Sequence, residues 1–99
     1  MNLDKSFIDK LIKHDEKAQK AFYQMLAPKM YGICLRFAAD RAEADDILQE
    51  GFIRVFTHLK DYRGEGSLEG WVRKTIVNTA INFYKKRIMR GSTTGLEQI

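Results

Sequence analysis

The feature that most constrains this sequence is an apolar stripe at helical spacing within residues 62–90. Val72, Ile76, Ala80 and Phe83 follow one another at steps of three and four, and residues at those steps share one face of an α-helix. A purely apolar face is stable only where a core covers it. A long helix packed against the rest of the chain is therefore expected here.

The opposite face of the same helix is polar and cationic. Its members at helical steps, called the cationic stripe below, are Trp71, Lys74, Asn78, Asn82 and Lys85. A basic stripe is often only a solvated helix face, but asparagine is a poor helix former, and two asparagines on this stripe favour a functional role. Amides, cations and an indole suit a nucleic acid, whose phosphates attract lysine and whose bases stack on rings.

The loop before this helix contains residues that permit a tight turn and a helix start. Gly64 and Gly66 relieve the steric limits on the backbone angles. Ser67 stands where an N-cap is expected, and Glu69 places a negative charge in the first helical turn. Tyr62 offers a ring on which a base can stack. The loop and the helix together are expected to form a pocket for one unpaired base.

The basic character of the chain belongs to this segment alone. Residues 1–61 hold ten Lys or Arg and ten Asp or Glu, whereas residues 62–90 hold seven against two. A local excess of positive charge is the electrostatic footprint of a nucleic-acid-binding protein.

The rest of the chain also has helical periodicity. A short amphipathic helix is predicted over residues 6–13, a second begins after a cap at Asp15, a third covers residues 30–39, and a fourth covers residues 41–60. Pro28 is expected at a turn or bend rather than inside a helix. No segment shows the two-residue period of a strand. The predicted fold class is all-α, a compact bundle of four to five helices.

The helix predicted over residues 41–60 has two different sides. Asp40 is its expected N-cap, and the acidic residues that follow complement the positive end of the helix dipole. The competing interpretation is a protein-docking face, because apolar residues lie beside the acidic ones. The residues of this side are Asp45, Asp46, Gln49, Glu50, Phe52, Ile53 and Arg54.

Catalytic and metal-binding patterns are not found in the sequence. His14 and His58 stand alone, without the spacing of a metal site. Cys34 is the only cysteine, so it has no disulfide partner within the chain and is expected to be an inert core residue. No cofactor, metal or enzymatic activity is expected. No apolar run reaches the ~20 residues of a membrane span, and a cytoplasmic location is the default for such a chain.

Four motifs occur in order along the chain: DRAEADDILQEGF (40–52), YRGEGS (62–67), GWV (70–72) and NTAINFYKKR (78–87). Together they resemble the second conserved region of bacterial sigma factors, and the extracytoplasmic-function class is the nearest match. The similarity covers about residues 7–90. It implies the helical fold of that region and the role of a promoter-specificity subunit of RNA polymerase.

The resemblance assigns two partners to two sets of residues. In this family the acidic helix docks on the clamp helices of the largest polymerase subunit; the matching residues are Asp46, Gln49, Glu50, Phe52, Ile53 and Phe56. The loop and the helix after it bind the non-template strand of the minus-ten promoter element. The matching residues are Tyr62, Arg63, Gly64, Ser67, Leu68, Trp71, Lys74, Asn78, Asn82, Lys85, Lys86 and Arg87.

The resemblance also suggests a domain organisation. Residues 1–90 correspond to the region 2 domain, and residues 91–99 are expected to begin a flexible linker. The second domain of the family, a helix-turn-helix, is not expected within these 99 residues. An anti-sigma factor is left open as a further partner. The alternatives are a freestanding helical module that binds duplex DNA and a protein-interaction domain with an incidental basic helix.

Overall fold

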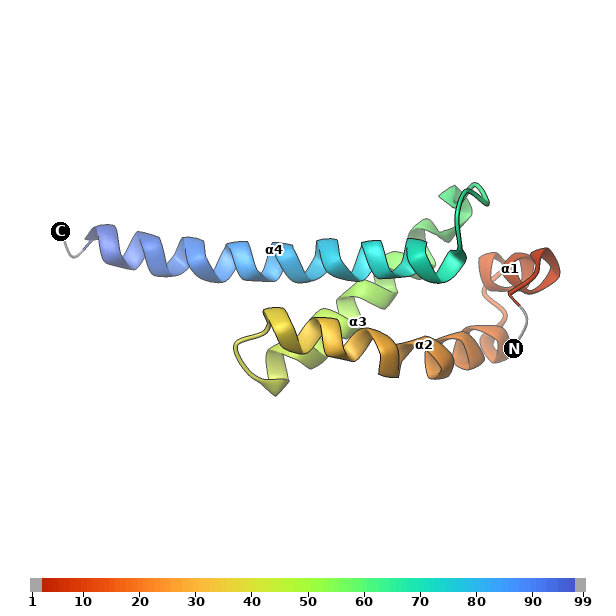
Figure 1. Ribbon diagram of the computed structural model, residues 1–99, viewed down its shortest axis with the longest axis horizontal. Coiled ribbons are helices and arrows are strands. Elements are labelled where there is room, and N and C mark those ends of the chain that lie inside the picture. The colour runs from red at the N-terminus through yellow and green to blue at the C-terminus, as the bar shows by residue number, and fades with distance from the viewer. Residues whose placement is uncertain (1–2, 98–99) are drawn as a thin grey trace.

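The computed structural model describes the backbone of residues 3–97 and the side chains of residues 3–90. Its elements are α1 (Lys5–Ile12), α2 (Glu16–Phe37), α3 (Arg41–His58), a 3-10 turn η1 (Leu59–Asp61) and α4 (Leu68–Glu97), arranged as Figure 1 shows. Over this range the chain contains no strand. The prediction of an all-α fold with four to five helices is confirmed.

Side-chain caps define where the helices begin. The carboxylates of Asp4, Asp15 and Asp40 each accept a hydrogen bond from the backbone N–H three residues later, at 2.8–2.9 Å. Ser67 caps α4 in the same way, with its hydroxyl accepting from the N–H of Gly70 at 2.9 Å. Each cap satisfies one of the N–H groups that a helix start leaves without a partner. The caps predicted at Asp15, Asp40 and Ser67 are confirmed.

Pro28 does not end a helix, and the prediction of a turn or bend there is wrong. It lies inside α2, which joins the two helices expected on either side of it. Proline cannot donate a hydrogen bond to the carbonyl of Gln24. Pro28 is exposed, however, so that carbonyl lies on the solvent side of the helix. On the other side Leu26 and Met30 are fully buried, and their burial outweighs the lost hydrogen bond.

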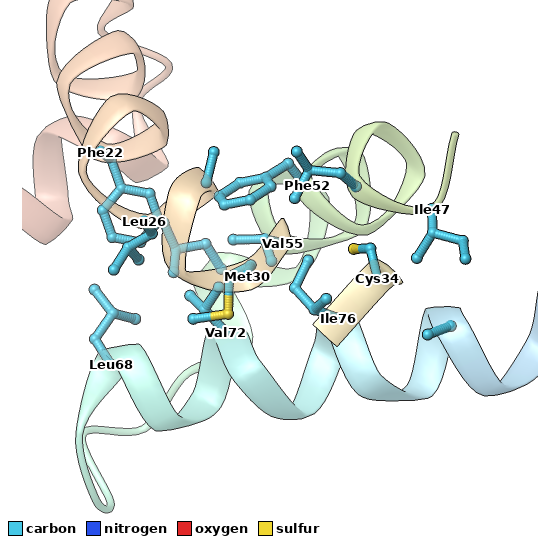
Figure 2. Packing of buried hydrophobic residues seen from close by; sticks show 14 of the residues in the cluster. Phe22, Leu26, Met30, Cys34, Ile47, Phe52, Val55, Leu68, Val72 and Ile76 are labelled. Atoms are coloured by element: carbon cyan, nitrogen blue, oxygen red, sulfur yellow. The ribbon is translucent and has the colours of Figure 1, made fainter. Parts of the chain in front are cut away.

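The core lies between α2, α3 and α4, with α1 covering one end through Leu11. Figure 2 shows its side chains interdigitating from the three helices. The apolar stripe of α4 faces this core as predicted, because Val72, Ile76 and Ala80 are 0% exposed. Phe83, the fourth member, is only partly buried and packs at the edge.

Helices α3 and α4 pack closely at a glycine. A Cβ atom on Gly51 would stand 2.5 Å from the Cδ1 atom of Ile76. No carbon pair tolerates that separation without movement. The missing side chain at Gly51 therefore lets the outer faces of α3 and α4 lie on neighbouring surfaces of the molecule.

Helix α4 runs past the corner where α2 turns into α3, and its C-terminal part leaves the bundle (Figure 1). The helical backbone continues to Glu97, through the glycine-containing segment at residues 91–95. That residues 91–99 begin a linker to a second domain stays a prediction. Within the described residues, no helix has the length and apolar character required to cross a membrane.

Candidate docking and nucleic-acid interface

The outer side of α3 presents an exposed ridge, called the docking ridge below. Its members are Asp46, Gln49, Glu50 and Ile53; Glu50 is partly buried, and Ile53 is 59% exposed. Glu50 is paired with Arg54 one turn later at 2.8 Å, whereas Asp46 and Gln49 have no side-chain hydrogen bond within the described part of the chain. An exposed isoleucine beside two polar side chains that lack partners among the described residues is suited to protein contact.

A hollow of about 460 Å³ lies on the α2 side of the docking ridge. Tyr23 of α2 stands 4.8 Å from Phe52 in an edge-to-face arrangement, measured between ring centroids. Phe52 is only 3% exposed, so it supports the hollow from below. The residues that line the hollow are Tyr23, Asp45, Leu48, Gln49, Phe52, Ile53 and Phe56.

A second hollow, of about 300 Å³, lies on the α4 side of the same ridge. It is lined by the four residues of the docking ridge and by Phe83 of α4. The sequence indicated Phe83 as a core residue and did not single out Tyr23. Each aromatic comes from a helix other than α3, so the periodicity of α3 could not reveal either of them.

Asp45 is less available than Asp46, although the two are adjacent. The hydroxyl of Tyr31 donates a hydrogen bond to Asp45, and this bond, with partial burial and the negative charge of Asp45, raises the pKa of Tyr31. The bond ties Asp45 to α2, while Asp46 points to the ridge. Consecutive helical residues diverge by about 100°, so the two carboxylates face different surroundings.

The cationic stripe is present on α4 as predicted. Lys74, Asn78, Asn82 and Lys85 are all exposed. Asn78 makes no side-chain hydrogen bond within the described residues, so its amide does not cap or bridge the local backbone. An amide held on a helix surface, with both its donor and acceptor free, can read the edge of a base.

The loop before α4 is closed by its own contacts. The Tyr62 hydroxyl donates to the carbonyl of Gly66 at 2.7 Å, and the Tyr62 ring lies 5.9 Å from the ring of Trp71. Gly64 and Gly66 have φ angles of 80° and 73°, in the left-handed region that favours glycine. The two glycines thus allow a preformed turn next to the cationic stripe.

Arg63 within this loop and Leu68 directly after it have different environments. Arg63 is exposed and has no ion pair within the described residues. Leu68 is 4% exposed and belongs to the core, so its side chain anchors the loop from beneath. Leu68 was predicted as a DNA-binding residue, but its side chain supports the loop from the core instead of lying on the surface.

The basic residues at the end of the stripe do not share one environment. Lys85 and Lys86 are exposed. Arg87 is partly buried, forms an ion pair with Glu43 of α3, and donates to the carbonyl of Phe37 at 3.0 Å. The sequence placed all three together as DNA contacts, but in the structure only the two lysines are free to meet a phosphate.

The remaining titratable and metal-ligating groups show no assembled site. Among the described residues no cluster of His, Cys, Asp or Glu could hold a metal ion. Cys34 is 0% exposed, and burial raises the pKa of its thiol to about 11. A thiol that stays protonated is a poor nucleophile, in agreement with the predicted core role.

The sequence of this chain is similar to those of known proteins. Residues 22–88 match the family model described as Sigma-70 region 2. The chain is 29% identical over 79 residues to the RNA polymerase sigma-H factor of Pseudomonas aeruginosa, a match that covers 80% of this chain and 41% of that protein. It is 28% identical over 80 residues to the ECF RNA polymerase sigma-E factor of Haemophilus influenzae, covering 81% and 42%.

A solved structure has the same fold. It is the NMR structure of the complex formed by an engineered region 2 of sigmaE with GTAAAA, with a TM-score of 0.76 and 22% sequence identity. The match covers 86% of this chain and 88% of that one. The chain thus spans most of a solved region 2 domain but only about two fifths of the two curated relatives above.

Proposed function

This chain belongs to the sigma-70 region 2 family, and from that premise we propose that it is the promoter-melting domain of a bacterial sigma factor. In this role it binds core RNA polymerase through α3 and the non-template strand of the minus-ten element through α4 and its preceding loop. It acts in the cytoplasm, where the polymerase is, and it uses binding energy rather than catalysis.

The observation that carries this proposal is the placement of two unlike surfaces on one core. The docking ridge on α3 and the cationic stripe on α4 belong to helices that touch at Gly51 and Ile76. A subunit that brings DNA to an enzyme needs such an arrangement, because one surface must hold the enzyme while the other holds the nucleic acid.

The shape of the α3 surface supports docking on a pair of helices. Ile53 and Gln49 form a crest with a hollow on each side, and each hollow has an aromatic wall from a different helix. Two helices lying side by side can place one side chain in each hollow and enclose the crest between them. The clamp helices of the largest polymerase subunit are the proposed occupant.

The α4 surface supports binding of an unpaired strand. Tyr62 and Trp71 present rings beside the loop, and stacking of a base on an aromatic side chain is worth about 1–3 kcal/mol. Lys74 and Lys85 attract phosphates along the stripe. Capture of unstacked bases offsets the few kcal/mol that extrusion of each base costs.

The proposal is tested by the binding of variants to purified core polymerase. Gln49→Ala and Asp46→Ala should each weaken binding by more than about 1 kcal/mol, because each removes a polar group at the centre of an interface. Asp9→Ala is the matched control, since Asp9 is exposed on α1 and caps no helix.

A second pair of variants tests the apolar contact. Ile53→Asp should reduce core binding at least tenfold, whereas Leu35→Asp, at an exposed leucine on α2 away from the ridge, should leave it unchanged. Circular dichroism should show parental helicity for both. If the Gln49, Asp46 and Ile53 variants all bind core polymerase as the parent does, α3 is not the docking face.

A further inference from the structure

The guanidinium group of Arg87 contacts one residue on each of two other helices and one aromatic ring on its own helix. One guanidinium nitrogen pairs with the Glu43 carboxylate of α3, and the other donates to the Phe37 carbonyl at the end of α2 at 3.0 Å. Its central carbon lies 5.4 Å from the centroid of the Tyr84 ring. The planar fork of arginine thus joins α4 to two other helices at once.

The partners of Arg87 are themselves held in place. The Glu43 carboxylate also accepts a hydrogen bond from the backbone N–H of Ala39 at 2.9 Å. The Phe37 ring meets Tyr84 edge to face at 6.5 Å. The corner between α2 and α3 and one turn of α4 therefore form a single cluster, called the corner latch below: Phe37, Ala39, Glu43, Tyr84 and Arg87.

The corner latch lies next to both the docking ridge on α3 and the basic end of the cationic stripe on α4. Arg87 is four residues beyond Phe83, which lines the α4-side hollow, and the C-terminal part of α4 leaves the bundle past the corner between α2 and α3 (Figure 1). Glu43 is one turn before Asp46 of the docking ridge. A small change of angle at the latch would move Lys85 and Lys86 relative to the ridge.

We propose that Arg87 is a positioning residue that sets the angle between α4 and the start of α3. It is not a phosphate ligand in this state, because Glu43 neutralises its charge and both sides of its fork are occupied. Its purpose, to keep the DNA-facing helix in register with the polymerase-facing helix, rests on the function proposed above. The angle itself is a property of the chain alone.

The experiment measures that angle as a distance in the free 99-residue chain. Nitroxide labels are placed at Thr57→Cys on α3 and Met89→Cys on α4, both exposed, while the buried Cys34 is shielded from the reagent. Pulsed electron paramagnetic resonance then gives the distribution of label-to-label distances in the parent and in each variant.

The parent should give a narrow distribution, and Arg87→Ala should broaden or shift it. Arg87→Lys keeps the charge but cannot hold Glu43 and the Phe37 carbonyl with one fork, so its distribution should be intermediate. Lys86→Ala, the adjacent exposed cation, should match the parent. Helicity by circular dichroism should be parental in Arg87→Lys, which is the deciding variant if Arg87→Ala loses structure.

A distribution as narrow in both Arg87 variants as in the parent, with the same mean, would overturn the proposal. So would equal broadening by Lys86→Ala, because the effect would then be one of charge in general. The measurement needs neither polymerase nor DNA. Its failure is therefore distinguishable from failure of the proposed function, which is read from binding to core polymerase.

Discussion

The outer faces of α3 and α4 cover the same core, yet they are built in different ways. The docking ridge on α3 is flanked by hollows whose walls include Tyr23 of α2 and Phe83 of α4. The cationic stripe on α4 consists of residues of one helix at regular steps, with the loop at Tyr62 beside it. The first surface depends on how helices pack, and the second depends mainly on one helix and its sequence.

The two faces should also differ in the forces they use. The docking ridge offers apolar area and a few polar groups, and apolar contacts depend little on salt. The stripe offers cations, whose attraction to phosphates weakens steeply as the salt concentration rises. The reason is that the release of counterions from the nucleic acid then contributes less free energy. Variants in the shared core, on the stripe and at its basic end can separate these contributions.

The largest effect is expected where both faces have a common support. Ile76→Ala removes a fully buried side chain that touches Gly51 across the α3–α4 contact, and it should destabilise the chain by about 2–5 kcal/mol. Urea denaturation measures the loss. Ile88→Ala, at an exposed isoleucine of the same helix, is the control and should change stability by less than about 0.5 kcal/mol.

Core binding and DNA binding should fall together in Ile76→Ala if the two faces depend on one folded core. Loss of one activity with retention of the other would show that the faces are supported independently. The faces of α3 and α4 would then belong to two separate units rather than to one core.

A smaller effect, confined to the α4 face, is expected from Asn78→Ala. The amide is exposed and without a side-chain partner among the described residues, so its loss should leave core binding unchanged. Stability should stay the same or rise by less than about 1 kcal/mol, because alanine is the better helix former. It should cost about 1 kcal/mol at the promoter position that it contacts. Selection from a promoter library by the reconstituted holoenzyme measures this preference, with Thr57→Ala on the exposed side of α3 as the control.

Unchanged base preference at every promoter position in the Asn78→Ala selection would remove the sequence-reading role of this face. The stripe would then contribute charge and stacking only.

The smallest effect is expected from the free cations at the end of the stripe. Replacement of Lys85 and Lys86 by glutamine should make the slope of log affinity against log salt shallower by about 1.4 for single-stranded DNA, at about 0.7 per phosphate contact. The loss should be similar for all sequences, since phosphates carry no base identity. Lys10 of α1 and Lys13 directly after that helix, both exposed, provide the doubly substituted control.

A parental salt slope in the Lys85 and Lys86 double variant, together with altered base preference, would contradict the assignment of these lysines to phosphates. Core binding should stay at the parental level in both double variants, because none of the four lysines lies on the docking ridge.

Much of this molecule follows from local sequence patterns. The apolar stripe of α4, the caps at Asp15, Asp40 and Ser67 and the absence of strand periodicity predicted an all-α fold, because capping and helical periodicity depend on residues three or four positions apart. The cationic stripe was predicted for the same reason. Its lysines and asparagines lie on one helix, so their spacing places them on one surface.

The tertiary structure decided what depends on residues far apart in the chain. Pro28 lies within a continuous α2 because burial of Leu26 and Met30 outweighs a local preference. Tyr23 and Phe83 reach the docking ridge only through helix packing. From the sequence Arg87 looks like a third free cation, yet it forms an ion pair with Glu43, which lies 44 positions away in the chain. Local periodicity assigns a residue to a face of its own helix, but only packing determines what that face meets.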